Sequence, residues 1–201
     1  MQRNLVVIIL FTLLVSSCSL MPSPKPVAVD KYLLEYTPSG NGTAPAADAT
    51  VVMISIPQSH GAYDTSRIAY MQQQYGLRYY TRSRWADTPA RMLAPLLAEA
   101  MNASGEFQSL YASPGRVAAD LRLDSELIRF HQDFTGQAVV MHLTVRIQLV
   151  DLREQRVLGS RLIDIREPAT SGDAYGAVQA ANRAVQQLLG QVVEFCSSLA
   201  H

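Results

Sequence analysis

The sequence contains few of the features that mark common classes of enzymes and metalloproteins. It has only two cysteines, one tryptophan and four histidines in 201 residues. Glycine-rich phosphate loops and the patterns Gly-x-Ser-x-Gly, Cys-x-x-Cys and His-x-x-x-His are all missing. These are the usual signatures of nucleotide binding, nucleophilic hydrolysis and metal or redox chemistry. The sequence therefore predicts no catalytic site, no metal site and no bound cofactor.

An excess of one charge is also missing. The whole chain carries 17 basic and 17 acidic residues, and removal of residues 1–17, which include Arg3, leaves 16 against 17. Binding to nucleic acid or to an anionic lipid surface depends on a surplus of basic groups. We therefore expect neither to be the main partner.

The chain has no hydrophobic run long enough to cross a membrane. Leu5 to Val15 is apolar apart from Thr12, but these eleven residues are too few for a transmembrane helix, which needs about 20. Arg3 before the run and the small residues after it are typical of a secretory signal. Residues 1–17 are expected to be a cleaved signal peptide.

Cys18 lies where cleavage is expected. Val15-Ser16-Ser17-Cys18 resembles a bacterial lipobox, in which the cysteine receives a diacylglycerol and then an N-acyl lipid. The alternative is an ordinary secretory signal with an incidental cysteine. Resemblance to lipoprotein sorting signals implies outer-membrane anchoring facing the periplasm, because Ser19 occupies a position where aspartate favours the inner membrane. Residues 18–30 contain Pro22, Pro24 and Pro26 and are expected to form an extended tether.

Residues 31–201 are long enough for a single domain with a substantial core. Once Cys18 is acylated, Cys196 is the only remaining thiol, so no intramolecular disulfide can form. We expect Cys196 to be buried on the last helix, although an intermolecular disulfide is an alternative.

Hydrophobic periodicity predicts an α+β fold, with a mixed, largely antiparallel sheet and two main helices packed on one face. Apolar positions at spacings of three and four after Pro89 predict a helix that ends near Gly105, and a second helix of about 25 residues follows Ser171-Gly172-Asp173. The expected strands cover 32–36, 51–56, 68–70, 77–80, 107–111, the stretch from 120 to 130, 139–149 and 157–165.

Details of three of these strands can also be predicted. Residues 51–56 form a continuous apolar run, which is typical of a strand buried on both faces. Leu127 and Ile128 change the parity of the apolar positions, so a β-bulge is expected near them. From Val139 to Leu149, apolar residues alternate with His142, Thr144, Arg146 and Gln148, which predicts a strand with one exposed polar face.

Two histidines on neighbouring strands are the nearest approach to a chemical site. His131, Asp133 and His142 could form a metal or acid/base cluster if their strands pair. A solvated sheet face is the favoured interpretation, and an enzyme built on these three residues is the least favoured hypothesis.

Aromatic and arginine residues are concentrated between positions 63 and 85. Such residues are enriched in protein interfaces and their hot spots. The alternative is that the rings complete the core and the arginines are simply solvated. The candidate partner-binding residues are Tyr63, Arg67, Tyr70, Tyr79, Tyr80 and Trp85.

Several short motifs together resemble the ABC-type transport auxiliary lipoprotein family, which includes the lipoprotein of the paraquat-inducible Pqi system. After the lipobox come Tyr32-Leu33-Leu34, residues 63–70, residues 77–80 and residues 85–93. Further matches are residues 105–107, 121–123, 132–134, 156–158 and Ala180-Ala181-Asn182-Arg183-Ala184. The chain departs from the family at Tyr63-Asp64-Thr65-Ser66-Arg67, where many members have Leu-Asp-Arg.

The resemblance implies an outer-membrane lipoprotein that works with an inner-membrane ABC transporter and an MCE-domain protein, in transport of phospholipid or another hydrophobic substrate. The leading hypothesis is a docking component anchored through Cys18, with homo-oligomerisation left open. The alternative is a periplasmic carrier that itself holds lipid between the helices and the sheet.

Overall fold

The computed structural model describes residues 28–38, 45–46, 49–111 and 118–200. These residues form two helices and a mixed sheet of nine strands, so the predicted α+β fold is confirmed. The signal peptide and Cys18 lie outside the described residues. The elements are β1 (Asp30–Tyr32), β2 (Thr50–Ile54), β3 (Gln58–Ser59), β4 (Arg67–Gln73), β5 (Gly76–Trp85), α2 (Pro89–Ala103), β6 (Phe107–Tyr111), β7 (Leu121–Asp133), β8 (Val140–Asp151), β9 (Arg156–Pro168) and α3 (Ala174–Leu199).

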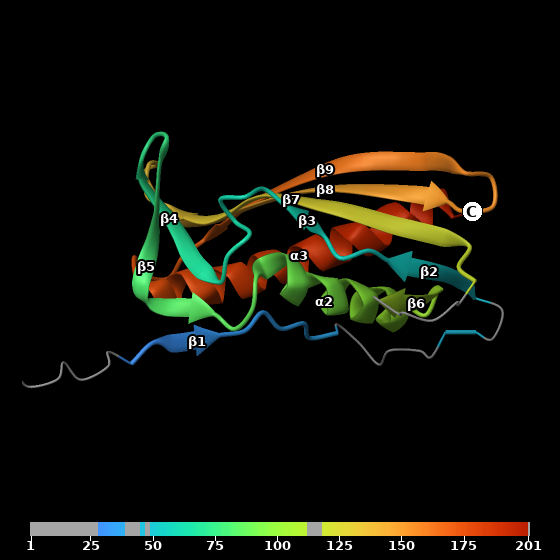
Figure 1. Cartoon of the computed structure of the whole chain (residues 1–201), viewed down its shortest axis with the longest axis horizontal. Coiled ribbons are helices and arrows are strands. Elements are labelled where there is room, and N and C mark those ends of the chain that lie inside the picture. Colours follow the sequence, from blue (N-terminus) through green and yellow to red (C-terminus); the bar gives the residue numbers. More distant parts are fainter. Residues whose placement is uncertain (1–27, 39–44, 47–48, 112–117, 201) are drawn as a thin grey trace, which may run out of the picture.

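Strand β7 organises the sheet. One of its edges pairs antiparallel with β8, which pairs antiparallel with β9. Its other edge is shared by β2, β3 and β4, each parallel to β7. Strand β2 then adds β6, while β4 adds β5 and β1. The sheet therefore divides into two branches, and the β4–β5 branch lies at the opposite end of the molecule from the β8–β9 turn (Figure 1).

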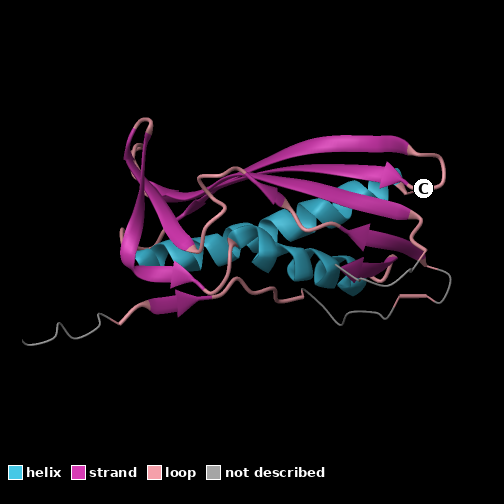
Figure 2. Ribbon diagram, viewed as in Figure 1, coloured by secondary structure: helices cyan, strands magenta, loops and turns pink. Residues whose placement is uncertain are grey.

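Both helices cover the same face of this sheet (Figure 2). Helix α3 packs on β8 and β9, while α2 packs on β6 and β2 and also contacts α3. The side chain of Asp173 caps α3 by accepting a hydrogen bond from the Gly176 N–H at 2.7 Å. The space between helices and sheet is filled by side chains that are at most 1% exposed, including Leu123, Leu143, Ile147 and Leu188.

The predicted bulge in β7 is present. The pairing of β7 with β8 shifts register between Leu127 and Arg129, where the apolar residues change parity. Leu127 and Phe130 are both buried on either side of this shift. The extra residue thus lets a strand of thirteen residues keep its apolar side chains toward the helices.

Two predictions about strand burial were wrong. Strand β2 is buried on one face only, because Val52 and Ile54 point into the core while Met53 is 37% exposed. Both helices cover the same side of the sheet, which leaves the outer face of this branch open. The opposite error concerns the first half of β8, where His142 and Thr144 are buried on the face that was expected to be solvated, whereas Arg146 on the same face is exposed as predicted.

The first predicted strand is also displaced. Strand β1 is only three residues long and ends at Tyr32. From Leu33 the chain leaves the sheet and runs along α3, where side-chain amides replace a neighbouring strand as hydrogen-bond partners. The N–H of Glu35 donates to Asn182 at 2.8 Å, and Gln186 donates to the carbonyl oxygen of Thr37 at 2.8 Å.

Candidate functional site

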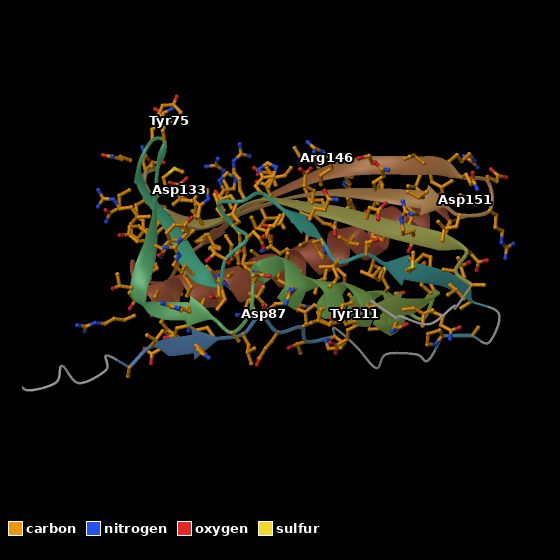
Figure 3. All side chains as sticks on the ribbon, viewed as in Figure 1. Tyr75, Asp87, Tyr111, Asp133, Arg146 and Asp151 are labelled. Atoms are coloured by element: carbon orange, nitrogen blue, oxygen red, sulfur yellow. The ribbon has the colours of Figure 1, made fainter. Side chains whose placement is uncertain are left out.

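The aromatic and arginine-rich segment forms β4, β5 and the loop that precedes them. The two strands make an antiparallel hairpin that rises from the sheet at one end of the molecule (Figure 1). Tyr75 occupies the turn with a left-handed φ of 67° and is 90% exposed (Figure 3). An aromatic ring at the tip of a projecting hairpin is therefore the most exposed large hydrophobic side chain of the described residues.

Two of the six predicted partner-binding residues belong to the core. Trp85 is 1% exposed and stacks on Phe130 with ring centroids 5.3 Å apart. Tyr63 is 9% exposed, and its hydroxyl is hydrogen-bonded to Nδ1 of His131 at 2.9 Å. Burial raises the pKa of Tyr63 to about 12. Neither ring is available to a partner in this conformation.

Tyr70 and Tyr80 lie together on the face that the helices cover. Their ring centroids are 4.7 Å apart, and the Tyr80 hydroxyl donates to the side-chain oxygen of Gln132 at 2.6 Å. Gln132 in turn donates to the backbone oxygen of Ser171, just before α3. This network connects the hairpin to the start of α3 while leaving both tyrosines half-buried.

Arg67 and Tyr79 lie on the outer face. The guanidinium carbon of Arg67 is 3.9 Å from the centre of the Tyr79 ring, a cation–π contact. The Tyr79 hydroxyl donates to the carbonyl oxygen of Ala62 at 2.9 Å. The structure thus separates the predicted set into buried rings, a tyrosine pair on one face and an arginine–tyrosine pair on the other.

Sequence reasoning missed a basic face on β1, β5 and β4. Lys31 and Arg67 both align with Arg84 on neighbouring strands, so the three cations lie side by side. Arg82 and Arg84 are exposed and alternate with the buried Ser83 and Trp85. No ion pair among the described residues involves any of these four cations.

Overall neutrality concealed this basic face. The only sequence signal was the alternation of arginines at 82 and 84, because the alignment with Lys31 and Arg67 depends on strand pairing. Like charges aligned across strands destabilise a sheet. An arrangement of this kind is favourable when an acidic surface covers it.

His131, Asp133 and His142, which the favoured interpretation placed on a solvated face, are brought together and buried. Their exposed fractions are 2%, 8% and 5%. Burial, His142 and the nearby arginines lower the pKa of His131 to about 4, against the opposing effect of Asp133. Burial raises the pKa of Asp133, but two hydrogen bonds from Thr135, together with the charges of His131 and Arg166, lower the pKa overall. Tyr63 covers His131, which explains why this face is not solvated.

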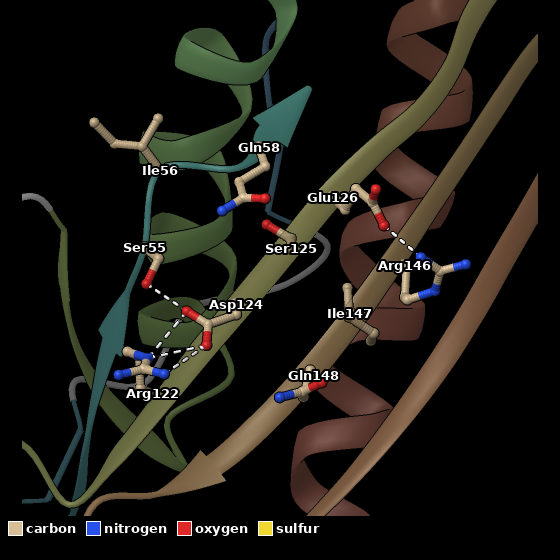
Figure 4. Close-up of a pocket in the computed structure, with 10 residues that line it drawn as sticks. All are labelled: Ser55, Ile56, Gln58, Arg122, Asp124, Ser125, Glu126, Arg146, Ile147 and Gln148. Atoms are coloured by element: carbon tan, nitrogen blue, oxygen red, sulfur yellow. Dashed lines mark hydrogen bonds and ion pairs between the residues drawn. The ribbon is translucent and has the colours of Figure 1, made fainter. Parts of the chain in front are cut away.

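An open groove of about 490 Å³ lies between the segment that connects β2 to β3 and the strands β7 and β8 (Figure 4). Its walls are polar: Asp124 accepts hydrogen bonds from Ser55 and Arg122, and Glu126 pairs with Arg146. The hydroxyl oxygen of Ser125, which also lines the groove, is buried and has no hydrogen-bond partner among the described residues. Paired charges make this groove unsuitable for an acyl chain.

The described residues contain no helix that is both long and apolar enough to span a membrane. A nine-stranded mixed sheet with two helices on one face places the described residues in the α+β class. The chain belongs to the family of ABC-type transport auxiliary lipoprotein components, whose model matches residues 32–193. The resemblance seen in the sequence motifs is thereby confirmed.

Solved structures show the same fold. Protein XCC0632 from Xanthomonas campestris, described under the family model DUF330, aligns with a TM-score of 0.72 at 21% identity, over 83% of this chain and 94% of that chain. An uncharacterized protein aligns with a TM-score of 0.65 at 11% identity, over 83% of this chain and 97% of that chain. Comparison with curated protein sequences gives no match.

Proposed function

We propose that this protein is the outer-membrane docking component of an ABC transport system that moves lipid or another hydrophobic substrate between membranes. It acts without catalysis, holding an MCE-domain partner against the membrane in which Cys18 is anchored. The observation that carries the proposal is the projecting β4–β5 hairpin, with Tyr75 exposed at its tip and the basic face at its base. Family membership supports the role in transport.

The chain that leads from the anchor is fixed to the domain. Strand β1 pairs with β5, and residues 33–37 are hydrogen-bonded to Asn182 and Gln186 of α3. Because β5 also forms one strand of the hairpin, the same structural unit carries the membrane connection and the proposed docking surface. The anchor at Cys18 therefore holds the docking surface, and with it the bound partner, close to the membrane.

The charge of the basic face indicates the charge of the partner surface that would bind it. The four cations of the basic face have no acidic partners among the described residues, so a docking surface with exposed carboxylates is expected. The aromatic tip and the arginines at the base of the hairpin are residue types that are enriched in interface hot spots.

Crosslinking tests the docking surface directly. A photoreactive amino acid at Tyr75 is expected to capture the MCE-domain protein in intact cells. The same group at Val157, which is 51% exposed beside the β8–β9 turn at the far end, serves as the control. Equal capture from both positions, or capture of unrelated proteins alone from Tyr75, would contradict docking through the hairpin.

Charge reversal supplies a second test. The double variant Arg82→Glu/Arg84→Glu is expected to weaken co-purification of the MCE-domain partner at least 10-fold. Arg91→Glu/Arg161→Glu reverses the same number of exposed charges on α2 and β9, and it is expected to leave co-purification unchanged. Circular dichroism should show that both variants are folded.

The anchor is tested by Cys18→Ala. A secreted, folded domain without lipid is expected to lose transport function in the cell, because the docking surface is no longer held at the membrane. Full activity of this variant would contradict the anchored role.

A lipid carrier is the second candidate, and the filled core argues against it. Leu123, Leu143, Ile147 and Leu188 occupy the layer where an acyl chain would have to lie. Native mass spectrometry of delipidated Cys18→Ala protein distinguishes the two functions. A docking component is expected to be detected at the mass of the protein alone, whereas a carrier would be detected with one bound lipid per chain.

A further inference from the structure

The buried histidine cluster on the outer face has no part in the docking proposal. His131 and His142 are directly opposite each other on β7 and β8, and Asp133 lies two residues after His131. All three side chains therefore project from the same face of the sheet. One potential ligand atom from each of the three lies within 4.8 Å of those of the other two.

Hydrogen bonds from outside the cluster determine which atoms are left to bind an ion. Nδ1 of His131 is occupied by the Tyr63 hydroxyl at 2.9 Å, which leaves Nε2. Nε2 of His142 is occupied by Asp164 Oδ1 at 2.8 Å, which leaves Nδ1.

The carboxylate is held in the same way. Oδ1 of Asp133 accepts hydrogen bonds from the Thr135 N–H and hydroxyl at 2.8 and 2.7 Å, which leaves Oδ2. Each of the three side chains is thus oriented through one atom by an outer partner and has one atom to spare.

We propose that His131, Asp133 and His142 form a binding site for one divalent first-row transition-metal ion of the zinc type. Two imidazole nitrogens and one carboxylate oxygen are a donor set that zinc and its neighbours accept, with a further position open to water. An outer carboxylate or hydroxyl on the second ring nitrogen is the usual support for a ligating histidine. Asp164 and Tyr63 occupy these supporting positions.

The surrounding charges are balanced. Asp133 and Asp164 provide two carboxylates, while Arg129 and Arg166 are the cations whose charges act on the cluster. The two carboxylates attract a divalent ion, whereas the two arginines that balance them repel it and lower its affinity.

Binding would join three parts of the fold at the junction of the β4–β5 branch. His131 and Asp133 come from β7, His142 comes from β8, and Tyr63 belongs to the loop before β4. The ion would therefore brace the base of the hairpin from the outer face.

The test uses the full-length protein extracted from membranes in detergent, stripped with EDTA and titrated with zinc chloride. Isothermal titration calorimetry should show one ion per chain, and saturating zinc should raise the melting temperature by about 5 °C. Magnesium chloride should have no effect, because magnesium prefers oxygen ligands. Absence of zinc binding to the wild-type protein would overturn the proposal.

Variants locate the ion. His131→Gln and Asp133→Asn should each weaken zinc binding about 100-fold, and Tyr63→Phe about 10-fold because it removes only an outer support. His60→Ala is the matched control, since His60 is exposed and paired with Glu126 at 3.0 Å on the same sheet face. Equal affinity in all four variants, or loss in His60→Ala alone, would place the ion elsewhere and refute the site.

If His131→Gln or Asp133→Asn does not fold, a crystal of the wild-type protein soaked in zinc chloride shows where the ion binds. A zinc anomalous peak between His131 and His142 would support the proposal. A peak only at surface histidines would overturn it.

Discussion

The side chain of Asn182 on α3 binds the backbone of residues flanking Leu34 on both sides, accepting from the Glu35 N–H at 2.8 Å and donating to the Leu33 carbonyl oxygen at 3.2 Å. Residues 33 and 35 are thus bound by one amide in the way that a neighbouring strand would bind them. The segment that follows the tether is consequently part of the folded domain. Its apolar Leu34 is 6% exposed in the core.

Asn182→Leu is therefore expected to lower the free energy of unfolding by about 2 kcal/mol, because the Glu35 N–H and the Leu33 carbonyl oxygen lose their hydrogen-bond partner. Urea denaturation measures the change. Gln191→Leu is the control, since Gln191 lies half-buried on the same helix and makes no side-chain hydrogen bond to the described residues. A matching loss in Gln191→Leu would mean that the amide contacts of Asn182 contribute nothing specific.

Trp85→Ala and Tyr75→Ala should have opposite effects on stability and docking. Trp85 is buried against Phe130, so its removal is expected to cost about 3–5 kcal/mol of unfolding free energy. Tyr75 is 90% exposed, so its removal should change stability by less than about 0.5 kcal/mol while weakening partner capture. Urea denaturation of each variant, followed by co-purification of Tyr75→Ala, checks both expectations.

Cys196 should be chemically inert in the native protein. It is 0% exposed, and burial raises the pKa of its thiol to about 12, so almost no thiolate exists at neutral pH. A disulfide-exchange reagent is expected to label Cys196 only after denaturant is added, in a Cys18→Ala background. Rapid labelling without denaturant, or a disulfide-linked dimer under non-reducing conditions, would contradict this burial.

Stability of the metal-free protein should fall as the pH drops from about 6.5 to 4. Burial, His142 and the charges of Arg129 and Arg166 lower the pKa of His131 from 6.5 to about 4, although Asp133 acts in the opposite direction and raises it. Between pH 6.5 and pH 4, His131 is therefore protonated in the unfolded chain but neutral in the folded protein, and this difference favours unfolding. The full shift corresponds to about 3 kcal/mol.

Urea midpoints measured in EDTA between pH 7 and pH 4.5 test this dependence. The decline should be shallower in His131→Gln, because the residue that titrates differently has been removed. His60→Gln should keep the wild-type decline, since His60 is exposed. Identical declines in the wild type and His131→Gln would show that His131 does not cause the pH dependence.

Local patterns in the sequence were sufficient for the elements themselves. The spacing of apolar residues predicted α2 and α3 closely, and the parity change near Leu127 predicted the bulge in β7. The lipobox-like sequence at Cys18 and the motifs of the transport family are also contiguous, so they can be read without a structure. Such features depend on residues that are neighbours along the chain.

Tertiary structure decided which faces are buried and which charges meet. The sequence could not show that Trp85 lies against Phe130, that Lys31 and Arg67 flank Arg84, or that His131 faces His142 under Tyr63. Each of these relationships joins segments that are far apart in the chain, and strand order and register place them together. Alternation fixes the two faces of a strand, but only the packing of the other elements determines which of those faces is covered.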